Sequence, residues 1–109
     1  MREYRFAETV AFANKIGDYW KKAVNSKTNT WYKFTSPQMT DAGVSITVEC
    51  NLAHSIIRLS LVSSPNSYTL LVTDLYDHSL QSIAYGIEYL FGYAKDVMLL
   101  NIRQKGKLL

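Results

Sequence analysis

Five side chains carry groups that do chemistry in many proteins: a thiol, two imidazoles and two carboxylates. They are Cys50, His54, Asp74, Asp77 and His78. Groups of this kind can ligate a transition metal or pair as nucleophile and base. Their spacing matches no known metal-site or catalytic signature, and Cys50 falls among the apolar positions of an alternating segment. We therefore expect no catalytic residue, no metal and no cofactor, and a protein that is not an enzyme. Whether the five cluster for a purpose stays open.

The elements that would position these side chains begin with a helix over residues 4–25. Its apolar side chains recur at helical spacing, at Phe6, Val10, Ala13, Trp20 and Val24. Residues 30–34 are rich in β-favouring types, and residues 44–50, 54–62 and 68–75 each alternate apolar with polar side chains, which predicts strands. Short loops join the last three strands, so we expect an antiparallel meander.

A second helix is predicted to follow, capped by Asp77 or Ser79 and ending before Gly106. The apolar seam of this helix is formed by Leu80, Ile83, Ile87, Leu90, Ala94 and Val97. The sequence thus predicts a single α+β domain over residues 1–109. It consists of an N-terminal helix, a four-stranded antiparallel sheet and a C-terminal helix, with both helices on one sheet face.

The other sheet face is expected to be rich in hydroxyl groups. It would be lined by Ser45, Thr47, Glu49, Arg58, Ser60, Thr69 and Thr73, with either Trp31 and Lys33 or Tyr32 and Phe34 at one side. Such a face can be solvated, closed by dimerisation, or used to stack unpaired nucleic-acid bases where aromatic residues lie beside basic ones.

Tyrosines recur every four residues along the predicted second helix, at Tyr85, Tyr89 and Tyr93. Tyrosine is enriched in interface cores, although these rings could instead pack against the sheet edge or the first helix. The following segment, residues 97–100, is apolar all round, which an isolated surface helix does not tolerate. Both features favour a homo-oligomer or a protein partner. The predicted interface comprises Tyr85, Tyr89, Tyr93, Val97, Leu99 and Leu100.

The formal charge of +3 conceals an uneven distribution along the chain. Residues 1–34 hold seven bases and three acids (+4), residues 35–94 one base and five acids (−4), and residues 95–109 four bases and one acid (+3). The basic ends suggest a nucleic-acid-binding module as the alternative, although lysines near helix C-termini also simply offset the helix dipole. The residues of this alternative are Trp31, Lys33, Arg58, Lys21, Lys22, Arg103 and Lys105. Whether the two basic ends form one patch stays open.

Size and composition exclude several classes of protein. A chain of 109 residues and 12.4 kDa, 48% hydrophobic and 19% charged, is neither a disordered tail nor a multi-domain enzyme. One cysteine permits no intrachain disulfide and fits a reducing, cytoplasmic compartment. The first residues lack the apolar core of a signal peptide. Charged residues interrupt the apolar stretch 83–100, so we expect no membrane association.

Overall fold

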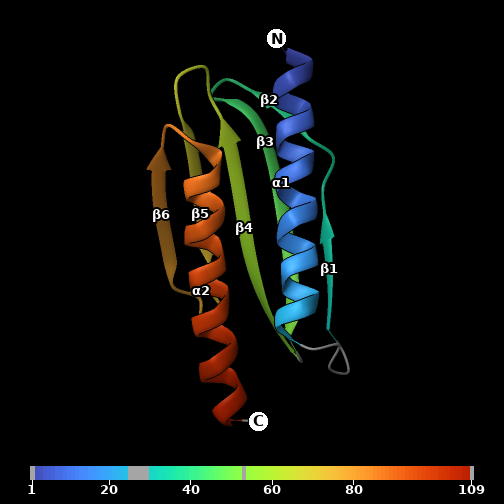
Figure 1. The fold of residues 1–109 in the computed structure, drawn as a ribbon, viewed down its shortest axis with the longest axis vertical. Helices are drawn as coiled ribbons and strands as arrows, with labels where there is room; N and C mark the ends of the chain where they lie inside the picture. The colour runs from blue at the N-terminus through green and yellow to red at the C-terminus, as the bar shows by residue number, and fades with distance from the viewer. Residues whose placement is uncertain (1, 25–29, 53, 109) are drawn as a thin grey trace.

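The computed structural model describes residues 2–24, 30–52 and 54–108. Two long helices flank a set of strands in the chain, and Figure 1 shows both helices against the same face of the sheet. The elements are α1 (Arg2–Ala23), β1 (Thr30–Phe34), β2 (Gln38–Thr40), β3 (Gly43–Leu52), β4 (Ser55–Ser63), β5 (Tyr68–Thr73), β6 (Ser79–Ala84) and α2 (Ile87–Leu108). The predicted α+β class, with an N-terminal helix, an antiparallel sheet and a C-terminal helix, is confirmed.

The sheet is antiparallel throughout, in the order β1-β3-β4-β5-β6, with β2 also paired to β3. β1 pairs with residues 48–52 and β2 with residues 43–45, so these two short strands occupy the same edge of the sheet. Residues 35–37, which include Pro37, interrupt that edge. Proline cannot donate to a ladder and is confined to edges and breaks. β1 matches the strand predicted over residues 30–34, whereas β2 and β6 were not predicted, so the sheet has six strands rather than the expected four.

Alternation places the apolar side of the central strands under the helices. On β3, every second residue from Val44 to Leu52 is buried, and Ile57, Leu59 and Leu61 of β4 continue the same layer. α1 lies over β1, β3 and β4, while α2 lies over β5 and β6 and also contacts α1 (Figure 1). One core therefore joins both helices to the sheet.

α1 approaches the sheet closely where it crosses β1. A Cβ atom at Gly17 would overlap the ring of Tyr32, which packs against the core from β1. At the other end of α1, the Tyr68 hydroxyl donates to the Glu8 carboxylate at 2.7 Å, which ties the helix to the start of β5. These contacts hold α1 at both ends.

The predicted beginning of the second helix was wrong. Residues 79–84 form β6, paired along its whole length with β5, and α2 begins only at Ile87. Neither Asp77 nor Ser79 caps a helix. Asp77 lies in the β5–β6 connection, and Ser79 is the first residue of β6. Tyr85 therefore lies before α2 rather than on it.

The reason for this error is visible in the β5–β6 connection. The Asp74 carboxylate accepts the backbone N–H groups of Tyr76 (2.9 Å) and His78 (2.8 Å), and Asp77 adopts a positive φ of 64°. This turn reverses the chain and returns it along β5, whose hydrogen-bonding groups outweigh the helical spacing of the apolar residues. α2 also continues past Gly106 to Leu108, further than the sequence predicted.

Candidate protein interface

The chemistry-bearing residues do not assemble into a site. Cys50 is fully buried in the core, and burial raises the pKa of its thiol to about 12, so the thiol is protonated at neutral pH. His78 lies 3.3 Å (Nδ1 to Oδ2) from Asp74, while His54 is exposed in the β3–β4 turn. Within residues 2–24, 30–52 and 54–108, no three His, Cys, Asp or Glu side chains gather as metal ligands.

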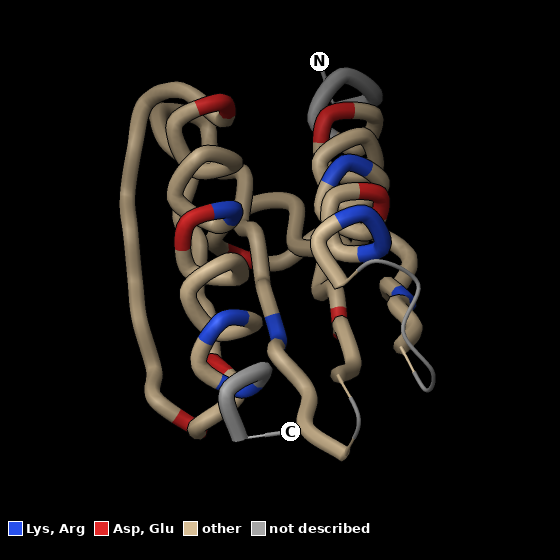
Figure 2. Tube along the Cα trace, turned by 60° about the horizontal axis from the view of Figure 1, so that its bottom comes forward, with Lys and Arg blue, Asp and Glu red and all other residues tan. Residues whose placement is uncertain are grey.

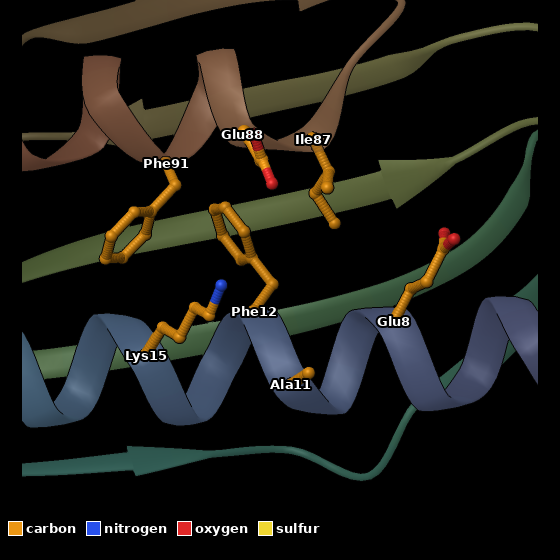
Figure 3. A pocket seen from close by; sticks show the side chains of 7 residues that line it. All are labelled: Glu8, Ala11, Phe12, Lys15, Ile87, Glu88 and Phe91. Atoms are coloured by element: carbon orange, nitrogen blue, oxygen red, sulfur yellow. The ribbon is translucent and has the colours of Figure 1, made fainter.

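A small cavity lies between the first halves of α1 and α2 (Figure 3). Phe12 and Phe91 meet there edge to face, with ring centroids 6.2 Å apart, and Glu8, Lys15 and Glu88 surround them. Its volume is about 90 Å³. Small-molecule pockets measure roughly 300–1,000 Å³, so this cavity is a packing gap between the helices rather than a ligand site.

The open sheet face is arranged as expected, and the register shows that Trp31 and Lys33, rather than Tyr32 and Phe34, join it. One carboxylate on this face, Glu49, contacts two basic side chains. Arg58 Nε lies 2.8 Å from one Glu49 carboxylate oxygen and Lys33 Nζ 3.6 Å from the other. Lys33 Nζ also lies 5.4 Å from the centroid of the Trp31 ring. The face is thus rich in hydroxyls and carries one excess positive charge in this row.

The basic residues of the two helices are divided among several places. Lys21 lies over Tyr32 of β1, 5.6 Å from Nζ to the ring centroid, and Lys105 lies over Tyr76 of the β5–β6 connection at 5.0 Å. Both are therefore on the helix side of the sheet, away from Arg58 and its neighbours on the open face. The predicted nucleic-acid residues do not share one surface.

Three lysines nevertheless lie together in a groove between the helices. We call it the lysine groove, and it is lined by Lys15, Asp18, Tyr19, Lys22, Phe91 and Lys95. Its volume is about 300 Å³. The ammonium groups of Lys15 and Lys95 lie 5.7 and 5.1 Å from the centroid of the same Phe91 ring. Lys22 and Lys95 thus bring the end of one helix beside the middle of the other.

The residues predicted as a protein interface lie along α2 and just before it. Tyr85 is 89% exposed, Tyr89 65% and Leu100 54%. Tyr93 and Val97 are partly buried and pack against the core. The alternative in which tyrosines pack on the fold therefore describes Tyr93, whereas Tyr85 and Tyr89 are turned to solvent. Leu99 is half-buried.

The apolar side chains beside α2 continue onto β6, where Leu80 is partly buried and Ile83 is exposed. Leu80 of β6 lines one open groove with Val97 and Leu100 of α2, of volume about 430 Å³, and Ile83 on the opposite side of β6 is 63% exposed. Tyr89 and Tyr93 line a second groove on α2, together with Glu88, Gly92 and Asp96. We refer to the whole as the β6–α2 surface: Leu80, Ile83, Tyr85, Tyr89, Tyr93, Val97 and Leu100.

The β6–α2 surface is free of charge along its strand. No Lys, Arg, Asp or Glu occurs in residues 79–87, and Figure 2 shows the outermost strand beside α2 without a coloured residue. Leu80 and Ile83 belong to this surface but were assigned to the helix seam by the sequence. The signal that could have identified them is the alternation of residues 79–84, in which Leu80, Ser82 and Ala84 share one face.

Among the described residues, the β6–α2 surface gathers exposed apolar side chains and tyrosines, and the lysine groove gathers basic side chains. Comparison of the chain with protein-family models, curated proteins and solved structures found no match. Among the described helices, none is long and apolar enough to cross a bilayer.

Proposed function

We propose that this protein is a non-enzymatic protein-interaction module that associates with a second copy of itself through the β6–α2 surface. The observation that carries the proposal is the exposure of large side chains around the β6 edge: Tyr89 and Leu100 on α2, Tyr85 between β6 and α2, and Ile83 on the open face of β6. Exposed apolar patches rimmed by polar residues mark interaction sites, and tyrosine gives such patches large, rigid contact area.

A two-fold dimer needs a surface that is complementary to itself, because the same patch is used by both copies. The strand of the β6–α2 surface meets this condition, since it has no charge that would face its own image. A patch with a fixed excess of one charge would instead favour a partner of opposite charge. The occupant that we propose is therefore a second copy of this chain.

The test is the oligomeric state, measured by sedimentation equilibrium over a range of concentrations. Leu100→Lys is expected to weaken dimerisation about 10- to 100-fold, which is about 1.4–2.7 kcal/mol, because an ammonium group must be desolvated in an apolar contact. The matched control is Met39→Lys, since Met39 of β2 is 51% exposed at the far edge of the sheet. A chain that stays monomeric at several hundred micromolar would contradict the proposal.

A second candidate function, binding of nucleic-acid phosphates, is supported by the lysine groove. Three lysines face one aspartate there, and none of these four side chains takes part in a described ion pair. Counterion release would make such binding strongly salt-dependent.

Fluorescence anisotropy with single- and double-stranded probes at increasing salt measures this binding. If the groove binds phosphates, Lys95→Gln is expected to reduce the slope of log affinity against log salt by about 1, in line with one lost phosphate contact. Lys33→Gln is the control, because Lys33 lies on the open face beside Glu49. Absence of any anisotropy change with either probe would remove this candidate.

A further inference from the structure

The two edges of the sheet differ in how they are protected. The β1–β2 edge is interrupted at residues 35–37, contains Pro37 and carries the charge of Lys33. β6 has six consecutive paired residues without charge or proline, and no described strand lies on its outer side. Proteins usually blunt exposed edges with charge, proline or a bulge, because a regular edge pairs with further strands. β6 has none of these three devices.

The hydrogen bonds of the β5–β6 connection show which backbone groups of β6 are available. The Asp74 N–H donates to the His78 carbonyl at 2.9 Å, and Asp74 and His78 continue the register in which Thr73 faces Ser79. Hydrogen-bonded and non-hydrogen-bonded pairs alternate in an antiparallel ladder. Leu80, Ser82 and Ala84 therefore direct their backbone groups to β5. The N–H and C=O groups of Ser79, Gln81 and Ile83 point outward.

We infer that β6 pairs edge to edge, and antiparallel, with β6 of a second copy of this chain, so that the two sheets become one continuous sheet. This inference rests on the proposed function and adds the mode of contact. The two-fold axis stands perpendicular to the sheet, which keeps the helices of both copies on the same face. With the axis at Ser82, Gln81 faces Ile83 of the second copy, and the outward backbone groups of both residues are satisfied.

The charges of α2 support an antiparallel arrangement of two copies. Residues 87–96 hold two acids and one base (Glu88, Asp96 and Lys95), whereas residues 97–108 hold three bases, Arg103, Lys105 and Lys107, and no acid. α2 lies over β5 and β6, close to the edge that pairs (Figure 1). α2 runs opposite to β6 and extends well past its start, so an axis at Ser82 sets the first turns of the two helices nearest each other (Figure 1). The basic ends around Arg103 and Lys105 then point away from one another, whereas a parallel pair would set these like charges side by side, which is unfavourable.

Gln81→Pro tests the strand pairing, because proline removes the outward N–H of an exposed edge residue and leaves the bonds to β5 intact. We expect the dissociation constant of the dimer to rise at least about tenfold, since each copy loses one hydrogen bond across the axis. Gln81→Thr is the matched control, as threonine keeps the N–H and favours strands, and it should dimerise like the original chain. Urea denaturation of both variants checks that each is folded.

Amide hydrogen exchange of the unmodified protein gives an independent measurement. The Gln81 and Ile83 amides are expected to exchange more slowly as the concentration rises, while amides of β1 and β2 stay unchanged. The strand pairing would be overturned if Leu100→Lys dissociated the dimer while Gln81→Pro left its dissociation constant unchanged and the exchange rates of the Gln81 and Ile83 amides did not depend on concentration. The proposed function would then still stand. A chain that is monomeric at every concentration would overturn both.

Discussion

Replacing Trp20 with alanine is expected to lower the free energy of unfolding by about 3–5 kcal/mol, the usual cost of truncating a fully buried large aromatic side chain. Trp20 is completely buried near the end of α1. Its indole Nε1 donates to the backbone carbonyl of Asn51 on β3, at 3.0 Å, across 31 positions of the chain. The substitution therefore opens a cavity between helix and sheet and also removes a hydrogen bond to a buried carbonyl.

Two further variants separate these contributions. Trp20→Phe keeps most of the ring volume but removes the donor, so we expect a smaller loss of about 1–3 kcal/mol, the combined cost of the lost hydrogen bond and of the lost part of the ring. Trp31→Ala is the control for tryptophan removal, because Trp31 is 38% exposed on the open face, and it should cost less than about 1 kcal/mol. Urea unfolding followed by circular dichroism measures all three. If Trp20→Ala cost no more than Trp31→Ala, Trp20 would not anchor α1.

The three central strands could be predicted from the sequence because one of their faces is buried. Burial on one side forces a period of two, and Val44, Ile46 and Val48 show that period without exception. The hydroxyl-rich face follows from the same alternation. The residue pattern of β1 does not determine whether Trp31 or Tyr32 joins that face, since both are aromatic and the strand is short. Pairing of Trp31 with Asn51 decides it.

β6 was missed because its short pattern satisfies two periodicities. Leu80, Ile83 and Ile87 are spaced as one face of a helix, and the same segment also alternates as an edge strand. Whether residues 79–84 form a strand or a helix depends on two features of the fold: the chain reversal around Asp74 and the edge of β5 with which these residues pair. Local spacing contains neither.

Only the part of the candidate interface that lies on α2 could be predicted from local spacing. Tyr89 and Leu100 are exposed, in agreement with helical spacing alone. Ile83 belongs to the surface only because β6 turns it away from the helices, which requires the strand to be known. The basic residues illustrate the converse: proximity in sequence placed Lys21 beside Lys22, but the fold directs the first to Tyr32 and the second to the lysine groove.

Gly43→Ala is the other substitution from which we expect a large effect. Gly43 has a φ of 139°, a conformation that side-chain-bearing residues rarely adopt, and a Cβ atom there would overlap the carbonyl oxygen of Ser63 on the neighbouring strand. Backbone strain costs about 1–3 kcal/mol and overpacking a similar amount, so we expect a loss of roughly 2–5 kcal/mol in unfolding free energy. The obstacle is backbone, so no change of side-chain rotamer relieves it.

The strain expected in Gly43→Ala acts at the turn between β2 and β3. Gly43 begins β3, directly after the tight turn from β2, and it pairs with Thr40, whose hydroxyl donates to the Gly43 carbonyl at 2.8 Å. Ala42→Ser, at an exposed position of the same turn, should change stability by less than about 0.5 kcal/mol. Thermal and urea unfolding of both variants test the contrast. A Gly43→Ala protein as stable as Ala42→Ser would mean that this turn relaxes without disturbing β4, and the pairing of β2 with β3 would then contribute little to the stability of the sheet.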